Sequence, residues 1–187
     1  MRLRATLVVT LATAVSCASP EAVLVAQAPP TLLMEPGGYE KAVVERAVDG
    51  DTIEVTITGR VPGPGAGKAP VGEKVTIRLL GIDTPESVDP RRPVECFGEE
   101  AAAAAAALLE GQTVVLVKDT EEVDAFGRLL RYVYLGHEMA NARLVINGYA
   151  ASYPYAPNVR HSSLLKELQR RARTTGRGLW AEGACGG

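Results

Sequence analysis

The sequence predicts a five-stranded Greek-key barrel of the OB type with three helices, a mainly β arrangement within the α+β class. Two stretches before residue 85 alternate apolar and polar residues, as half-buried strands do. An alanine-rich helix separates the first three expected strands from two later ones, and two further helical segments follow the last strand. A chain of 187 residues is long enough for one such domain with its own core.

The first 17 residues are typical of a signal peptide. Met1–Arg4 carries two basic residues, and the apolar stretch Ala5–Ala14 is too short to span a bilayer as a permanent helix. We therefore expect the protein to be exported.

The expected signal can be processed in two ways. Residues 14–17 (AVSC) resemble the lipobox of bacterial lipoproteins, in which the cysteine, here Cys17, is lipidated and begins the mature protein. Residues 18–38, rich in Pro, Ala and Gly, would then form a flexible tether to the outer face of the cell membrane. Alternatively, an ordinary signal peptidase cleaves after Ala18 or Ala28, and the protein is secreted without an anchor.

Apart from Cys17, the chain has two cysteines, Cys96 and Cys185. An even pair in an oxidising compartment predicts a disulfide that holds the C-terminal tail to the segment before the first helix. The alternative is two separate buried thiols. His137 and His161 are not in ligand spacing with a cysteine, which argues against a zinc site.

The formal net charge is −2, although basic residues gather near the C-terminus. Nucleic-acid-binding proteins are often basic overall, so this value weighs mildly against tight nonspecific binding. It does not weigh against an enzyme that must release a polyanionic product. The gathered basic residues are Arg160, Lys166, Arg170, Arg171, Arg173 and Arg177.

The expected elements follow in order along the chain. A strand at 42–48 and a turn at 49–51 precede two alternating strands, Thr52–Thr58 and Lys74–Ile82. The Gly- and Pro-rich loop between those strands is long, and we expect it to be mobile at the surface. The later elements are a helix at 99–110, strands at 112–118 and 129–135, and helices at 138–146 and 162–175.

The two alternating strands predict a metal site if they form an antiparallel hairpin. Thr58 then lies near Val75, and paired residue numbers sum to about 133. This register places Asp51 opposite Ile82 and beside Asp83. Two carboxylates this close repel one another unless a cation lies between them.

Four motifs contain most of the reactive side chains. They are DGDT at 49–52, RLLGIDTPE at 78–86, DAFGR at 124–128 and YPYAPN at 153–158. In this order and spacing the chain resembles the staphylococcal nuclease (thermonuclease) family from Tyr39 to Trp180. The resemblance implies an SNase-like nuclease domain at 39–182, with 183–187 as a C-terminal tail. It also implies endonucleolytic cleavage that leaves 3′-phosphates and 5′-hydroxyls.

The resemblance implies that Ca²⁺ is bound by the carboxylates of Asp51 and Asp83, by the backbone carbonyl of Thr84 and by water. Oxygen ligands in a flexible site suit calcium. Asp49 would not contact the ion itself but would hold these ligands in position. Taken alone, residues 49–51 would be an ordinary β-turn.

Three further residues match the catalytic groups of the family. Glu86 matches the general base that accepts a proton from the attacking water. Arg78 and Arg128 match two arginines that bind phosphate, since one planar guanidinium can contact two phosphate oxygens at once.

Tyr153 and Tyr155 resemble the aromatic pair that lines the nucleotide pocket of the family. Stacking accepts any base, which indicates low sequence specificity and a preference for single strands. The alternative role for these tyrosines is ordinary loop packing. One departure is Ala125, where the staphylococcal enzyme has a lysine near the nucleotide phosphate.

These observations predict a calcium-dependent nuclease that acts outside the cytoplasm on DNA and RNA, as a monomer. One alternative is a noncatalytic nucleic-acid-binding module on the same barrel, but the intact Arg78, Glu86 and Arg128 argue against it. The other is an exported lipoprotein that binds small ligands, which would need neither the two arginines nor the DGD turn.

Overall fold

The structure is a computed structural model that describes residues 33, 35–87 and 93–185. The predicted signal peptide at 1–17, the lipidation of Cys17 and most of the tether lie outside the described residues. Among the helices that the structure describes, none is both long and apolar enough to cross a membrane.

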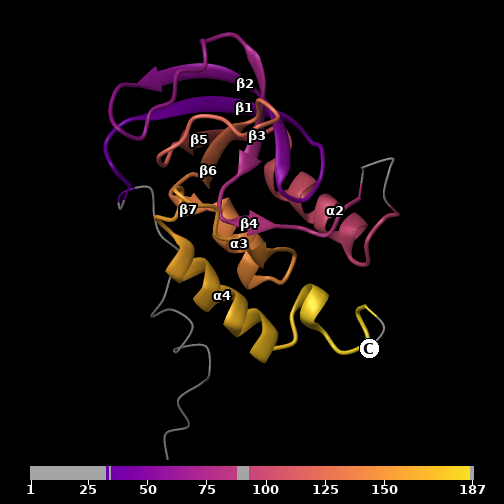
Figure 1. Cartoon of the computed structure of the whole chain (residues 1–187). Coiled ribbons are helices and arrows are strands. Elements are labelled where there is room, and N and C mark those ends of the chain that lie inside the picture. Colours follow the sequence, from indigo (N-terminus) through magenta and orange to yellow (C-terminus); the bar gives the residue numbers. More distant parts are fainter. Residues whose placement is uncertain (1–32, 34, 88–92, 186–187) are drawn as a thin grey trace, which may run out of the picture.

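Five strands close into a barrel (Figure 1). Strand β1 (Tyr39–Ala47) pairs antiparallel with β2 (Thr52–Val61) on one side and with β5 (Thr113–Val117) on the other. Strand β3 (Lys74–Leu79) pairs with β2, and β6 (Leu129–Leu135) pairs with β5. A parallel pairing between β3 and β6 closes the barrel, so the predicted five-stranded barrel is confirmed.

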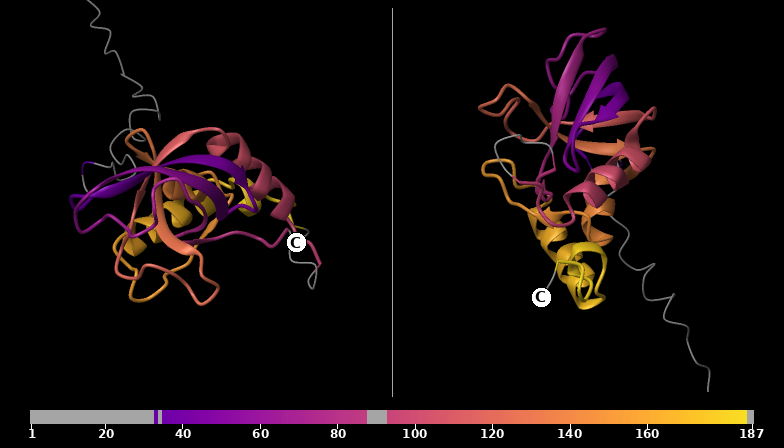
Figure 2. Two further views of the ribbon diagram at one scale, coloured as in Figure 1. Left: turned by 90° about the horizontal axis from the view of Figure 1, so that it is seen from above. Right: turned by 90° about the vertical axis from the view of Figure 1, so that its right-hand side faces the viewer.

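The helices lie toward one end of the barrel (Figures 1 and 2). They are α2 (Gly98–Leu109), α3 (Ala140–Ile146), α4 (Ser162–Thr174) and the 3₁₀ helix η3 (Gly178–Trp180). The helix expected at 138–146 begins two residues late, because β7 (Glu138–Met139) pairs with β6. A further short pair joins β4 (Ile82–Asp83) to β8 (Ala151–Ser152) and connects the barrel to the segment that precedes α4.

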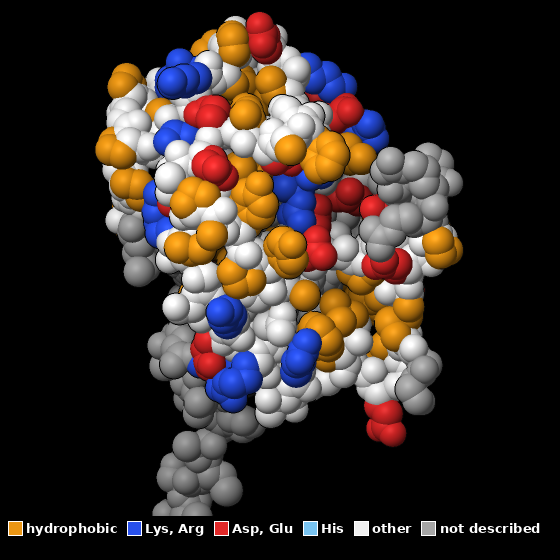
Figure 3. Space-filling model, in the orientation of Figure 1, with side chains coloured by type: hydrophobic (Ala, Val, Ile, Leu, Met, Phe, Trp, Pro, Cys, Tyr) orange, Lys and Arg blue, Asp and Glu red, His pale blue; other side chains and the backbone are white. Residues whose placement is uncertain are grey.

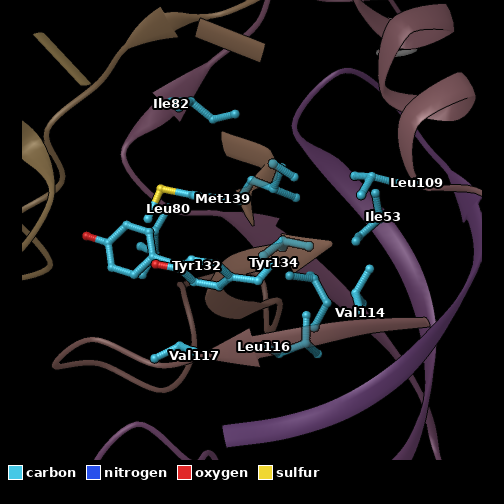
Figure 4. Close-up of a cluster of buried hydrophobic side chains, with 14 of the residues drawn as sticks. Ile53, Leu80, Ile82, Leu109, Val114, Leu116, Val117, Tyr132, Tyr134 and Met139 are labelled. Atoms are coloured by element: carbon cyan, nitrogen blue, oxygen red, sulfur yellow. The ribbon is translucent and has the colours of Figure 1, made fainter. Parts of the chain in front are cut away.

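The core fills the barrel and the space under the helices (Figure 4). Inward-facing side chains of the strands meet Leu109 of α2 and Met139 of β7, and all are buried. Asn141 is buried on α3, where its side chain donates to the carbonyl of Leu80 and accepts from the N–H of Val133, both at 2.9 Å. These two bonds fix α3 to the strand ends that carry the site.

The pairing of β2 with β3 differs from the predicted register. Val55 lies opposite Val75 and Ile53 opposite Ile77, so the paired numbers sum to 130 rather than 133. Residues directly opposite one another point to the same face of a sheet. Both strands bury odd-numbered positions, so the sum has to be even, and the predicted register was wrong.

The loop at 62–73 was expected at the surface, and most of its residues are exposed, but part of it is buried. Its expected mobility stays a prediction. Ala69 is buried and its N–H donates to Glu40 at 3.2 Å. Beneath the loop, Arg131 is fully buried between Glu40, at 2.7 Å, and Glu122. A buried ion cluster is stable only when its hydrogen bonds are satisfied, and the loop backbone helps to satisfy them.

Residues 35–38, expected at the end of the tether, contact the barrel. The Glu35 carboxylate accepts from Arg160 at 2.8 Å, lies 2.5 Å from the ring of His161, and accepts a hydrogen bond from Tyr134. The packed domain therefore begins before Tyr39.

The predicted disulfide between Cys96 and Cys185 is present, with the two Cα atoms 5.6 Å apart. Replacing both cysteines with serine is expected to lower the free energy of unfolding by about 2–4 kcal/mol, because the bond restricts the unfolded chain. Urea denaturation would measure this change. Reductant should destabilise the parent protein and leave the double variant unchanged; equal midpoints in parent and variant would contradict the prediction.

Candidate active site

The turn after β1 brings its carboxylates to the end of β3. Asp49 accepts a hydrogen bond from the N–H of Asp51 at 2.9 Å, which stabilises the turn. Gly50 lies so close to Thr84 that an added Cβ would be 2.7 Å from its side chain. The glycine is therefore required for the turn to approach the segment after β4, where Thr84 donates from its N–H to Asp51 at 2.9 Å.

Arg78 lies between the two carboxylates that were predicted as metal ligands. Its Nη2 atom is 3.2 Å from Asp51 Oδ2 and 2.8 Å from Asp83 Oδ1. Its Nη1 atom donates to the carbonyls of Leu79 and Ile82, both at 2.8 Å. These contacts hold the guanidinium in one orientation at the strand end.

Burial raises the pKa of Asp51 to about 6, although Arg78 opposes the shift. The neighbouring charge of Asp49 raises this pKa further, the N–H of Thr84 lowers it, and the charge of Asp83 raises it again. A buried carboxylate repelled by two others gains from a nearby cation. In the structure Arg78 supplies such a positive charge to Asp51.

The donor chemistry of these residues fits the predicted calcium site. Asp51 and Asp83 offer carboxylate oxygens, the hard donors that Ca²⁺ prefers, while the backbone contact of Thr84 with Asp51 is made by its N–H. In the part of the chain that the structure describes, no group of three or more His, Cys, Asp or Glu residues is arranged to hold a metal. The predicted set has only two such side chains and relies on a carbonyl and water for the rest.

Asp124 orients Arg128. Its Oδ2 atom accepts from Arg128 Nε at 2.7 Å, while its Oδ1 atom accepts from the N–H groups of Phe126 and Arg128, both at 2.9 Å. Burial raises the pKa of Asp124, but these hydrogen bonds lower it overall, so the carboxylate stays charged. The outer end of Arg128 reaches Thr52 Oγ1 at 3.3 Å, on the strand end opposite Arg78.

Glu86 is held by two hydrogen bonds with Glu95. The N–H of Glu86 donates to Glu95 Oε2 at 3.1 Å, and the N–H of Glu95 donates to the carbonyl of Glu86 at 2.8 Å. An added Cβ on Gly98, at the start of α2, would lie 2.6 Å from the carbonyl of Glu86. The helix start and the disulfide at Cys96 thus fix the backbone on which Glu86 lies.

Two adjoining pockets contain all the predicted site residues. A polar pocket of about 320 Å³ is lined by Asp49, Asp51, Arg78, Asp83, Thr84, Pro85, Glu86, Glu95 and Arg128. A more apolar pocket of about 280 Å³ is lined in part by Tyr153, Tyr155 and Phe126. Both pockets are lined by Arg78, Asp83 and Arg128. A phosphate group bound at the two arginines would therefore place an aromatic group attached to it in the second pocket. Figure 3 shows a face of the molecule on which basic and acidic side chains adjoin beside apolar ones.

Comparison with known proteins identifies the family. The family described as "Staphylococcal nuclease homologue" matches residues 76–182. The chain belongs to the staphylococcal nuclease family. Two members of this group, the thermonucleases of Staphylococcus hyicus and Staphylococcus intermedius, are each 35% identical to it, over 74% and 75% of this chain and 74% and 76% of their own. The SPbeta prophage-derived endonuclease YokF of Bacillus subtilis is 33% identical over 74% of this chain and 43% of its own.

Four residues of this family member were missed as site residues by the sequence analysis. Thr52 and Asp124 lie inside the motifs, where only their neighbours were assigned roles. Phe126 has an apolar side chain that is 85% exposed, which is a signal for binding. The sequence showed only that an aromatic residue lies within the DAFGR motif. Glu95 lies outside the motifs, and only the fold places it beside Glu86.

Phe126 is expected to stack on a base. Its ring centroid lies 5.5 Å from the guanidinium carbon of Arg128, at the border of the two pockets. Replacing Phe126 with alanine should raise KM for single-stranded DNA roughly tenfold and change kcat little, since stacking contributes about 1–3 kcal/mol per base. Steady-state kinetics would measure both constants, with Val71→Ala, at another exposed apolar residue, as the control. An unchanged KM would remove Phe126 from the binding site.

Proposed function

We propose that this protein is a calcium-dependent, extracytoplasmic nuclease that hydrolyses DNA and RNA with low sequence specificity and acts as a monomer. Its relatives indicate a nuclease, that is, a phosphodiester hydrolase. The observation that carries the finer proposal is the convergence of two oriented arginines, two carboxylates and a glutamate on one polar pocket beside an aromatic one.

In the proposed reaction Arg128 donates hydrogen bonds from its outer nitrogens to the oxygens of the scissile phosphate. Arg78 donates once its Nη2 atom exchanges the contact with the exposed Asp83 carboxylate for a phosphate oxygen. These bonds strengthen as negative charge builds on the equatorial oxygens of the phosphate, which lowers the barrier. Glu86 accepts a proton on its carboxylate from the attacking water, the new P–O bond forms, and the bond from phosphorus to the 5′-oxygen breaks. The departing 5′-oxygen takes a proton from solvent water. The products are a 3′-phosphate and a 5′-hydroxyl.

Asp51, Asp83 and the carbonyl of Thr84 would hold Ca²⁺, with Asp49 supporting the turn behind them. A calcium ion bound there would supply positive charge close to the scissile phosphate. Tyr153 and Tyr155, which are 53% and 39% exposed, would stack on the base next to that phosphate.

The location outside the cytoplasm is proposed from the N-terminal sequence and the disulfide. Disulfides persist mainly in oxidising compartments, and Cys96–Cys185 is such a bond. Whether Cys17 is lipidated or removed with the signal decides between an anchored and a free protein. Mass spectrometry of the mature protein would distinguish them.

The test of the function is cleavage of heat-denatured DNA and of RNA by the purified protein, with calcium or with EDTA. We expect cleavage only with calcium. An Arg46→Ala variant, which removes an exposed arginine on β1 paired with Glu54, should cleave like the parent. Binding of DNA without any cleavage by the parent would overturn the nuclease proposal and leave a binding module.

A further inference from the structure

Helix α4 presents three exposed basic side chains in one row. Lys166, Arg170 and Arg173 are spaced four and three residues apart, so they lie on one face of the helix. The buried residues Leu165 and Leu168 mark the opposite, core-facing side. We refer to the three basic residues as the α4 row.

The α4 row lies on the flank of the helix that adjoins the aromatic pocket. Gln169 accepts a hydrogen bond from the N–H of Ser152 at 2.6 Å, and Ser152 directly precedes Tyr153 of that pocket. Lys166 and Arg173 are three residues before and four residues after Gln169, so they flank it on the helix surface. Figure 3 shows basic side chains over this lower part of the molecule, on the same face as the mixed basic and acidic surface.

The α4 row has a net positive charge and is partly ordered in advance. The guanidinium of Arg173 lies 4.0 Å from the centroid of the Trp180 ring, a stacking contact that restricts the side chain. Arg170 pairs with Glu167, the one acidic residue of α4, but this pair is exposed and therefore weak. A phosphate could contact Arg170 at little cost.

We propose that the α4 row binds the sugar–phosphate backbone of a single-stranded polynucleotide that extends past Tyr153 from the active site. This inference rests on the proposed nuclease function and assigns its substrate class: long single strands are preferred over short oligonucleotides. The second pocket, about 280 Å³, is bounded at Tyr153 and Tyr155, so a longer strand has to leave it over the protein surface. With a net charge of −2 for the whole chain, attraction to a polyanion has to come from a local basic surface such as this one.

The test compares long and short substrates with a Lys166→Gln/Arg170→Gln/Arg173→Gln variant. On heat-denatured DNA, KM should rise roughly tenfold, and the slope of log KM against log salt should fall by about 2, at about 0.7 per lost phosphate contact. On a fluorescent dinucleotide with a single scissile bond, turnover should stay within about twofold of the parent, because a dinucleotide has no further backbone beyond Tyr153 to contact the α4 row. The matched control is Lys41→Gln/Arg46→Gln/Lys74→Gln, which removes three exposed charges from β1 and β3.

The outcomes separate this inference from the function on which it rests. If the triple variant and the control have the same KM and salt slope on long DNA, the α4 row does not bind substrate and the inference fails. If the parent cleaves neither substrate, the nuclease proposal itself fails. If the triple variant unfolds, the double variant Lys166→Gln/Arg170→Gln replaces it, because it retains the contact between Arg173 and Trp180. The double variant should still raise KM on long DNA severalfold. An unchanged KM would overturn the inference.

Discussion

Replacing Arg128 with lysine is expected to lower kcat on DNA by roughly 10²–10³-fold, the scale of losing one donor that acts in the transition state. The charge is retained, but the geometry is not. Arg128 uses Nε to bind Asp124 and leaves its outer nitrogens for Thr52 and for a phosphate. A lysine has one ammonium group and cannot do both.

The comparison needs a control and a companion variant. Arg46→Lys changes an arginine that makes a similar two-nitrogen contact with Glu54 on the surface, and it should leave kcat unchanged. Asp124→Ala should reproduce part of the loss while Arg128 is intact, because the guanidinium then loses its orientation. If Arg128→Lys keeps kcat within threefold of the parent, Arg128 does not act on the transition state.

The sequence predicted the barrel because most of its strands alternate clearly. The expected strand at 129–135 has the bounds that the structure shows, and the helix expected at 99–110 differs by one residue at each end. The predicted register of β2 with β3 was wrong. The alternation of apolar residues at odd-numbered positions in both strands excludes an odd sum, but the sum of 130, among the even ones, is known only from the structure.

Contacts between distant residues could not be predicted from local patterns. Arg131 looks like an outward-facing strand residue, yet it is buried against Glu40, which is 91 positions away. The loop at 62–73 covers this pair, and its burial follows from the ion cluster rather than from its own composition. The docking of Glu35 against His161 likewise depends on the completed fold.

More of the candidate site than of the strand register could be predicted from the sequence, because the site residues lie in compact motifs. Arg78, Asp83 and Glu86 fall within nine positions, and all three line the polar pocket. Asp51 reaches them although the predicted register was wrong, since the turn after β1 bends toward Thr84. Glu95 was beyond prediction, because it lies nine positions from its contact Glu86 in the sequence and outside the four motifs.

Asp51→Asn is expected to abolish the calcium response of the protein, both in cleavage and in thermal stability. For the parent, calcium at 100 times its Kd should stabilise the fold by about 2.7 kcal/mol, and Tm should rise accordingly. In the variant a neutral amide replaces a carboxylate ligand, so Tm should be the same with calcium and with EDTA. Thermal melts and cleavage assays at pH 7.5 would measure both effects.

Without calcium the same variant should be at least as stable as the parent at pH 7.5. Burial raises the pKa of Asp51 to about 6, above its unfolded value, so the charged form disfavours folding, and stability falls as pH rises from about 4 through 6. Asparagine removes this effect. Asp83→Asn is the matched comparison: the Asp83 side chain is 55% exposed, so this variant should lose the calcium response with little change in EDTA. The contrary result is a parent protein that is more stable than Asp51→Asn in EDTA. It would show that the contact of Asp51 with Arg78 stabilises the fold by more than the burial of its charge destabilises it. The charged Asp51 would then need no bound cation.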